Sequence, residues 1–253
     1  MADFLLVHDT GQGSWCWGAV WGHLTAPVEQ PPRLYSRGSR GNVITPDLPG
    51  HGSRAQEDVS GLTLADFVSA VTNEVESRGL RDLILVGHGA IAPILVEAAA
   101  KLQHPPKRVV LFAGIVPDEG KTSMDMLPRA GRLGFNLLTT LQWDKGKGFK
   151  LPNPVIVNLY CNGMDPFDIV QIVGRFRHLP TQIVRTKIYL DGLTRNFPIT
   201  YVPLWRDRLA SSEKQIRMAE RLGGVEVVRE LDSCHQVMIE RPKEVADILL
   251  RYA

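Results

Sequence analysis

The sequence predicts an α/β fold with a mostly parallel, doubly wound sheet. Short apolar runs without polar alternation occur at residues 4–7, 83–86 and 109–112, as in strands that are buried on both faces. Segments with apolar residues at helical spacing separate these runs. Such an alternation of strands and helices is typical of a parallel sheet that is covered by helices on both sides.

In the first half of the chain, local signals mark each element. The glycine-punctuated stretch "HDTGQGS" ends the first strand, and Thr63 stands where the N-cap of a helix is expected. The expected elements are, in order, a strand at 4–7, a helix at 15–24, an exposed loop at 26–42, a strand at 43–45, a helix at 64–76, a strand at 83–86 and a helix at 91–102.

In the second half, the rhythm breaks between about residues 116 and 186. Gly, Pro, Met and Lys interrupt short helical patterns there, so we expect an insertion over the end of the sheet. The elements expected around it are strands at 109–112, 187–190 and 225–228 and helices at 212–222 and 243–252.

The composition indicates a single domain and excludes a nucleic-acid-binding surface. The chain has 253 residues, 44% of them hydrophobic, which is enough for one sizeable core. Charged residues make up 22%, and the formal net charge is +2. The most basic stretch, residues 33–40, has the composition of a solvated loop.

The sequence also suggests the compartment. The apolar run at the N-terminus is too short for a signal peptide, and no run approaches the ~18 residues of a membrane span. Cys16, Cys161 and Cys234 are odd in number, widely spaced and without metal-ligand spacing. We therefore expect a cytoplasmic protein without a disulfide framework, metal or cofactor, and a homodimer is possible.

One strand-to-helix corner carries the main functional signal. In "LILVGHGAIAP", residues 83–93, an apolar strand runs into small residues around Gly89 and then into a helix. Many enzymes place a nucleophilic serine at such a sharp turn, which needs small neighbours. Gly89 has no side chain, so the corner is either a nucleophile elbow that has lost its nucleophile or a plain connection.

Several motifs in order decide between these alternatives. Together with the corner, "HDTGQGSWCW", "PDLPGHG", "LYCNGMDP" at 159–166, "KIYLDGLTRNFP" at 187–198 and "DSCHQVMIERPKEVADIL" at 232–249 closely resemble the α/β-hydrolase superfamily. The resemblance is strongest to its methylesterase and hydroxynitrile-lyase branch and to bacterial esterase relatives. It implies an α/β-hydrolase fold, with one domain over residues 1–253 and a small helical cap at about 116–186.

The resemblance also implies a Ser–His–Asp triad, which this sequence fills only in part. His235 matches the catalytic histidine, whereas Gly89 occupies the position of the nucleophile. The acid is expected three residues after Gly192, where Arg195 stands. The triad acid is therefore expected to be missing, and the double loss favours natural divergence over a single engineered change.

The loop after the first strand departs from the family as well. The resemblance places the two N–H groups of the oxyanion hole at Thr10 and Ala90, and it places Gln12 within reach of a substrate. Asp9 stands where the family usually has glycine or threonine. We expect Asp9 and His235 to form an acid–base pair across the site; the alternative is a loop residue that caps local N–H groups.

These residues predict a cofactor-independent enzyme that acts on a small, largely apolar carbonyl compound. His235 is expected to be the base, Asp9 to assist, and the N–H groups of Thr10 and Ala90 to polarise an oxygen. The reaction class stays open between lyase, decarboxylase, cyclase or isomerase, and water-activating hydrolase. Two other functions stay open: a small-molecule-binding pseudoenzyme, and an ester hydrolase inactivated at Gly89.

Two neighbouring residues are expected to be structural. Cys234 adjoins His235, but adjacent side chains rarely reach the same atom, and a free cysteine is commonly just buried. His88 precedes Gly89, where the family commonly has a histidine that is not catalytic.

Overall fold

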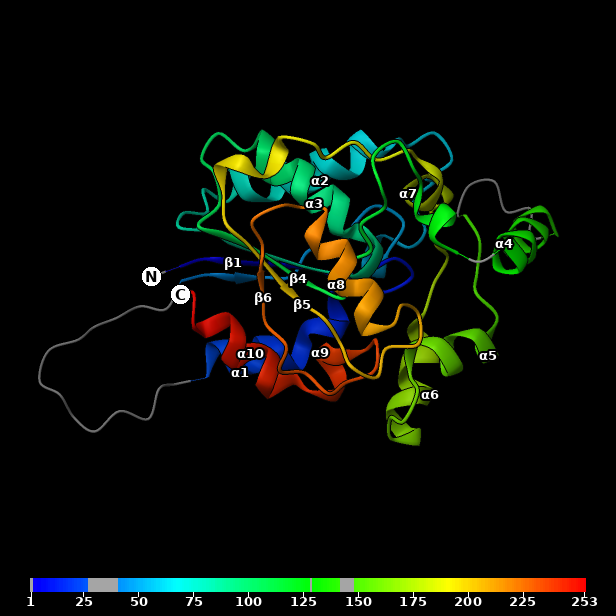
Figure 1. Ribbon diagram of the computed structural model, residues 1–253. Coiled ribbons are helices and arrows are strands. Elements are labelled where there is room, and N and C mark those ends of the chain that lie inside the picture. The colour runs from blue at the N-terminus through cyan, green and yellow to red at the C-terminus, as the bar shows by residue number, and fades with distance from the viewer. Residues whose placement is uncertain (1, 27–40, 128, 142–147) are drawn as a thin grey trace, which may run out of the picture.

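The centre of the molecule is a six-stranded parallel sheet in the order β2-β1-β3-β4-β5-β6 (Figure 1). The computed structural model describes residues 2–26, 41–127, 129–141 and 148–253. The strands are β1 (Phe4–Val7), β2 (Val43–Ile44), β3 (Ile84–His88), β4 (Arg108–Phe112), β5 (Ile199–Val202) and β6 (Glu226–Val227). The predicted fold class is confirmed.

The central strands are mostly apolar because both of their faces are buried. In β1 every residue is buried. Leu5 and Val7 belong to one hydrophobic core, while Phe4 and Leu6 belong to a second core on the opposite face. Side chains alternate across a strand, so a run without polar residues supplies two cores at once.

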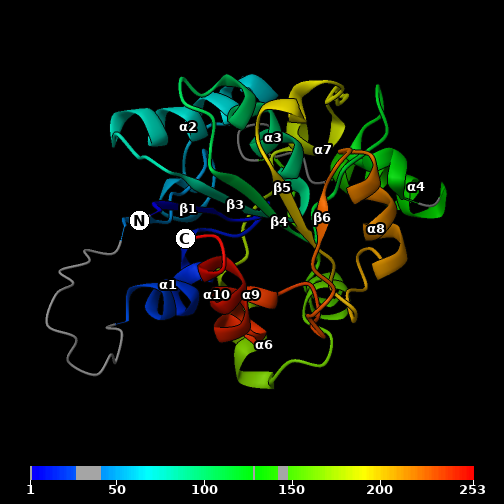
Figure 2. The ribbon, with the colours of Figure 1, turned by 60° about the vertical axis from the view of Figure 1, so that its left-hand side comes forward.

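Helices cover both faces of the sheet. Figures 1 and 2 show α2 (Leu64–Ser77) and α3 (Ala92–Lys101) on one face and α1 (Gly18–Thr25) and α10 (Pro242–Leu250) on the other. Two further helices are α8 (Ser212–Glu220), which contributes to the α2–α3 core, and α9 (Val237–Glu240), which contributes to the α1–α10 core. The sheet is therefore doubly wound, as the strand and helix order predicted.

The chain between β4 and β5 forms a separate group of helices. These are α4 (Arg129–Leu141), α5 (Asn153–Val155), α6 (Pro166–Arg175) and α7 (Thr181–Arg185), with a π-helical turn, η5 (Ile156–Tyr160), after α5. Figure 1 shows α4, α5 and α6 beyond one end of the strands. A third hydrophobic cluster joins Tyr160 and Phe176 of this group to Cys234. The limits of the cap, about 116–186, stay a prediction.

Most of the expected elements form within a few residues of their predicted ends. The helix expected at 15–24 is divided between a 3-10 turn, η1 (Ser14–Trp17), and α1. Thr63 caps α2 in a capping box in which the Asp66 carboxylate accepts the Thr63 N–H at 2.7 Å. Of the loop expected at 26–42, residues 27–40 lie outside the described part of the chain. The remaining 3-10 turns are η2 (Gly52–Arg54), η3 (Gly89–Ile91), η4 (Ser123–Met126) and η6 (Leu193–Asn196).

The prediction of a strand at residues 187–190 is wrong. Its alternating pattern is real, because Ile188 and Leu190 are buried in the core between exposed neighbours. However, its backbone pairs with a loop: Ile188 N donates to Lys121 O at 2.9 Å, and Gly120 N donates to Ile188 O at 2.8 Å. The segment is extended and packed on the core without joining the sheet.

The strand that takes this place in the sheet is β5, about ten residues later. Its sequence, "ITYV", is β-branched and aromatic, as strands prefer. It pairs with β4 in the register Val109↔Ile199 and Phe112↔Val202. The displacement matters for function, because the residues after β5 reach the site described below.

Among the described residues, no helix has both the length and the apolar character that crossing a membrane requires.

Candidate active site

Four residues from distant parts of the chain meet at one edge of the sheet. Asp9 follows β1, Gly89 follows β3, Asp207 follows β5 and His235 follows β6. Because the strands are parallel, their carboxyl ends share this edge, where α/β proteins commonly bind ligands. The structure places Asp9 and His235 together at this edge, and their role as an acid–base pair stays a prediction.

The carboxylate of Asp9 occupies the predicted oxyanion hole. Its Oδ1 accepts a hydrogen bond from Thr10 N at 2.7 Å and another from Ala90 N at 2.8 Å. The side chain is only 1% exposed. Thr10 and Ala90 therefore do present two convergent N–H groups, but the oxygen that they bind belongs to the protein and not to a substrate.

Gly89 is the residue that makes room for this carboxylate. A Cβ at position 89 would lie 2.2 Å from Asp9 Oδ2 and 2.3 Å from Asp9 Cγ. Gly89 also has a φ of +64°, a backbone conformation that residues other than glycine rarely adopt. Asp9 thus fills the volume in which a side chain at the elbow would stand.

His235 has an acid partner, so the expectation that the triad acid is missing is wrong. Its Nδ1 lies 2.7 Å from Asp207 Oδ2, and both side chains are fully buried. Arg195, the position where the acid was expected, lies in the turn η6 before β5. Asp207, the observed acid, lies after β5. Assigning a strand to residues 187–190 placed the search for the acid too early in the sequence.

A sequence signal for Asp207 existed. The run "ITYV" lies between Pro198 and Pro203, as an isolated strand does, and Asp207 is the first carboxylate after it. Residues after a parallel strand gather at the edge that holds the site. The resemblance to the family directed attention to an earlier segment instead.

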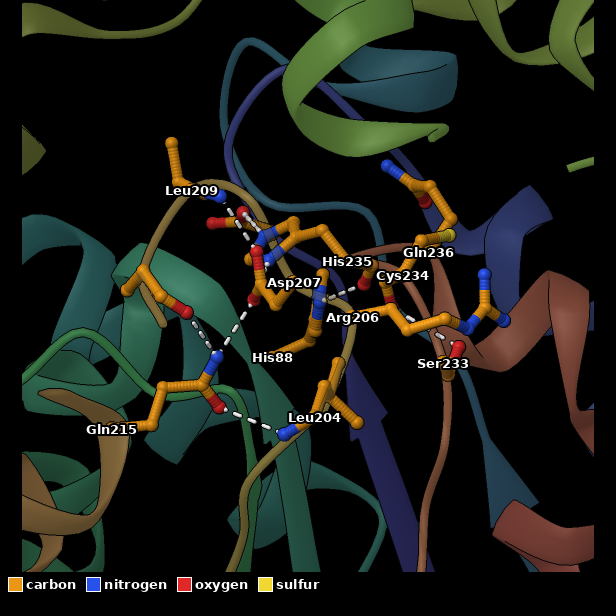
Figure 3. A network of polar contacts seen from close by, with 12 residues as sticks. His88, Leu204, Arg206, Asp207, Leu209, Gln215, Ser233, Cys234, His235 and Gln236 are labelled. Carbon is orange, nitrogen blue, oxygen red and sulfur yellow. Dashed lines mark hydrogen bonds and ion pairs between the residues drawn. The ribbon is translucent and has the colours of Figure 1, made fainter. Parts of the chain in front are cut away.

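Asp207 is fixed by an amide from α8 (Figure 3). Gln215 Nε2 donates to Asp207 Oδ2 at 2.9 Å and to Ala210 O at 2.7 Å, while its Oε1 accepts Leu204 N at 3.0 Å. The second carboxylate oxygen, Oδ1, accepts Leu209 N at 2.8 Å. Sequence analysis did not identify Gln215, because a glutamine inside an amphipathic helix carries no functional signal.

The loop that carries His235 is tied to the loop that carries Asp207. Glu240 Oε2 accepts the Ser233 hydroxyl at 2.7 Å and Cys234 N at 2.8 Å. Its other oxygen, Oε1, pairs with the guanidinium of Arg206, the residue before Asp207. Burial raises the pKa of Glu240, but these donors together hold it below its usual value.

His235 stands between two carboxylates. Its Nε2 lies 3.3 Å from Asp9 Oδ2, on the opposite side of the ring from Asp207. An imidazole that donates from Nδ1 can bond the second carboxylate only through one more proton, which Nε2 and Oδ2 share. Burial lowers the pKa of His235, but the charge and hydrogen bond of Asp207, together with those of Asp9, raise it to about 10.

The state of Asp9 matches this arrangement. Burial raises the pKa of the Asp9 carboxyl, but the hydrogen bond with His235, the nearby histidines and the Thr10 N–H bring it below its ordinary value. The resting pair is therefore an Asp9 carboxylate against a His235 imidazolium.

Aromatic rings enclose His235. His88 packs against it with ring centroids 4.3 Å apart, and Tyr160 of the turn η5 approaches edge-on at 4.9 Å. Burial raises the pKa of the Cys234 thiol, which fits the expectation that this cysteine is structural rather than nucleophilic. Gln12 is buried and donates from Nε2 to Gln236 Oε1 at 2.9 Å; its contact with a substrate stays a prediction.

Comparisons with known proteins agree with this architecture. The sequence pattern of the family described as "Alpha/beta hydrolase family" matches residues 4–248. A carbendazim-hydrolysing esterase from Nocardioides sp. (strain SG-4G) is 30% identical over 130 residues, which are 51% of this chain and 49% of that protein. The match therefore spans about half the length of that relative.

Other similar proteins match over the full chain. Methylesterase 9 from Arabidopsis thaliana is 23% identical over 274 residues, covering 100% of this chain and 98% of the relative. The structure of an extracellular alpha/beta-hydrolase from a Paenibacillus species superposes with a TM-score of 0.81 at 17% identity, covering 100% of this chain and 99% of that one. At that identity the structural likeness establishes the fold alone.

Proposed function

The chain belongs to the alpha/beta hydrolase family, and we propose that it is an enzyme that performs acid–base chemistry without a serine nucleophile. Its substrate is a small, largely apolar carbonyl compound, and it needs no cofactor. The observation that carries the proposal is the position of Asp9: its carboxylate fills the nucleophile's volume, and His235 is 3.3 Å away.

The pair supplies a base and an acid together. Asp9 Oδ2 takes the proton of a β-hydroxyl group, the carbon–carbon bond next to it breaks, and the Nε2–H of His235 protonates the enolate that leaves. The products are an aldehyde and a ketone. Asp9 then returns its new proton to His235, so turnover has no net gain or loss of protons. Sequence reasoning made His235 the base; its place between two carboxylates favours the acid.

The geometry favours lyase or isomerase chemistry over ester hydrolysis. Acyl transfer builds negative charge on a substrate oxygen, which two N–H groups normally stabilise. Here Thr10 N and Ala90 N already bind Asp9 Oδ1. A second anion next to that carboxylate would be repelled, whereas neutral proton exchange between Asp9 and His235 adds no charge.

The same contact argues against an esterase that was inactivated by a single change at position 89. A serine there would place its Cβ within 2.3 Å of two atoms of the Asp9 carboxylate. Asp9 and Gly89 therefore form a matched pair. The esterase names of the relatives support a carbonyl group in the substrate rather than the serine mechanism.

A panel of three probes tests the proposal: a β-hydroxy ketone, a β-keto acid and p-nitrophenyl acetate, with product formation followed by NMR. We expect turnover of at least one of the first two and little of the ester. Asp9→Asn and His235→Ala should each lower turnover by at least ~10²-fold, the usual contribution of a positioned acid or base.

Matched controls distinguish a local effect from a general one. Asp247→Asn removes a carboxylate from α10, where it pairs with Lys243, and His23→Ala removes an exposed imidazole on α1. Both should leave turnover unchanged. Full activity in Asp9→Asn would contradict the proposal, and tight binding of the probes without turnover would make the protein a binding pseudoenzyme.

A further inference from the structure

His88 carries a nitrogen lone pair that the proposed reaction does not use. The residue is fully buried, and its Nε2 lies 2.8 Å from the carbonyl oxygen of His235. A carbonyl can only accept, so Nε2 carries the hydrogen and Nδ1 is left with a lone pair. Among the described residues, Nδ1 has no hydrogen-bond partner. A buried acceptor without a partner is uncommon and calls for a physical explanation, of which an ion is one.

Two residues next to His88 supply further atoms that could bind a metal ion. One ligand atom each from His88, His235 and Asp9 can be chosen so that all three lie within 4.8 Å of one another. All three residues are buried. Two imidazoles and one carboxylate are a donor set that divalent zinc and its neighbours in the first transition row prefer, whereas magnesium and calcium prefer oxygen alone.

The outer contacts of these residues leave one ligand atom on each that the surrounding protein does not hold. His235 directs Nδ1 to Asp207, His88 directs Nε2 to a backbone carbonyl, and Asp9 directs Oδ1 to two N–H groups. Histidines that bind metals almost always have their second nitrogen engaged in this way. His235 Nε2, His88 Nδ1 and Asp9 Oδ2 are what remain for an ion.

A second buried histidine pair shows what a site without this property looks like. His8 and His51 pack with ring centroids 5.0 Å apart. Both nitrogens of His8 are engaged, since Nδ1 contacts Asp9 O at 2.8 Å and Nε2 accepts Leu48 N at 3.2 Å. Only His51 Nε2 is unpartnered there, so that pair offers a single lone pair.

We propose that Asp9, His88 and His235 form a binding site for one divalent transition-metal ion of the zinc type, with an open coordination position. The charge of the ion is balanced by the Asp9 carboxylate and, through His235, by Asp207. Binding needs no substrate and stands independently of the proposed function. One consequence does rest on that function: the ion replaces the proton shared by Asp9 and His235, so it inhibits turnover.

The test uses the full-length protein after dialysis against a chelator. Titration with Zn²⁺ in a calorimeter should give one ion per chain with a Kd of about 10 µM or tighter. Co²⁺ in place of Zn²⁺ should give visible absorption bands of nitrogen and oxygen ligation without the thiolate charge-transfer band that the cysteines would produce.

Variants decide where the ion binds. His88→Gln and Asp9→Asn should each weaken Zn²⁺ binding by at least about 10-fold, while His51→Gln, the matched control, should leave it unchanged. Circular dichroism checks that each variant is folded, and if one fails to fold the other carries the comparison. Lack of saturable Zn²⁺ binding by the wild-type protein, or undiminished binding in a folded His88→Gln or Asp9→Asn variant, would overturn the proposal.

Discussion

The two sides of the site differ in how much they share with the catalytic arrangement that the resemblance implies. On the side formed after β5 and β6, Asp207 and His235 keep the hydrogen-bonded acid–histidine arrangement of a hydrolase. On the side formed after β1 and β3, position 89 is glycine, and the Asp9 carboxylate beside it accepts the N–H groups of Thr10 and Ala90. A histidine that is hydrogen-bonded to a carboxylate can serve in any proton transfer, so the chemistry of the Asp207–His235 pair does not require a serine beside it.

The residues after β1 and β3, Asp9 and Gly89, depend on each other. Asp9 Oδ2 lies 2.2 Å from the position that the Cβ of any other residue at position 89 would take. The two positions are therefore coupled: a serine at position 89 would collide with Asp9, whereas removal of Asp9 would free the N–H groups of Thr10 and Ala90. The predictions below test how far the two sides are independent.

The largest effect is expected from introducing a serine at position 89. Gly89→Ser alone should lower the melting temperature and give no esterase activity, because the new side chain meets Asp9 in a backbone region that is strained for serine. Gly89→Ser combined with Asp9→Gly frees the two N–H groups next to an intact Asp207–His235 pair. We expect p-nitrophenyl acetate hydrolysis at least ~10³-fold above that of the single variant.

A double variant that is folded but inactive would contradict the view that the histidine side is complete. Strong esterase activity in Gly89→Ser alone would show instead that Asp9 moves aside easily and that the collision is not limiting.

The next largest effect concerns the acid partner. In the rebuilt esterase, Asp207→Asn should lower kcat by at least ~10²-fold, because His235 loses the charge that orients it and stabilises its cation. Asp191→Asn, on the segment where the acid was first expected, is the matched control and should leave kcat unchanged. Equal losses in both variants would contradict the assignment of Asp207.

A smaller effect is expected at Gln215, which acts through Asp207. Gln215→Met keeps the volume but removes the Nε2 donor to Asp207 Oδ2 and leaves Leu204 N without its acceptor. We expect roughly a 10-fold fall in kcat with KM unchanged, and a loss of about 1–3 kcal/mol in the free energy of unfolding. Lost stability with undiminished kcat would show that Gln215 supports the fold alone.

The smallest effect is a difference in acid response. Burial, followed by the charge of His8, lowers the pKa of His51 to about 3 from an unfolded value of 6.5. As the pH falls below 6.5, the His51 imidazole becomes protonated in the unfolded chain but stays neutral in the folded protein. His51 therefore makes the folded protein progressively less stable as the pH falls from 6.5 toward 3. Denaturant unfolding of His51→Gln should show a shallower loss over this window; an unchanged slope would contradict the prediction.

Sequence reasoning identified the side of the site that is marked by local motifs. Gly89, Asp9, Thr10 and Ala90 all stand next to a strand that apolar runs reveal, so their meeting at one edge could be predicted. His235 followed from the likeness of its segment to a known family. Asp207 was missed because "KIYL" shows the alternation of a strand, although its backbone hydrogen bonds go to a loop.

By itself, the sequence determined the parallel α/β architecture, because buried strands need continuous apolar runs and their order limits the topology. It also determined that position 89, at the end of a buried strand, has no side chain to act as a nucleophile. Only the tertiary structure decided that Asp9 fills the space above Gly89, that Asp207 supports His235 and that His88 leaves a lone pair buried beside them. These facts depend on distances between side chains remote in the sequence, which no local pattern encodes.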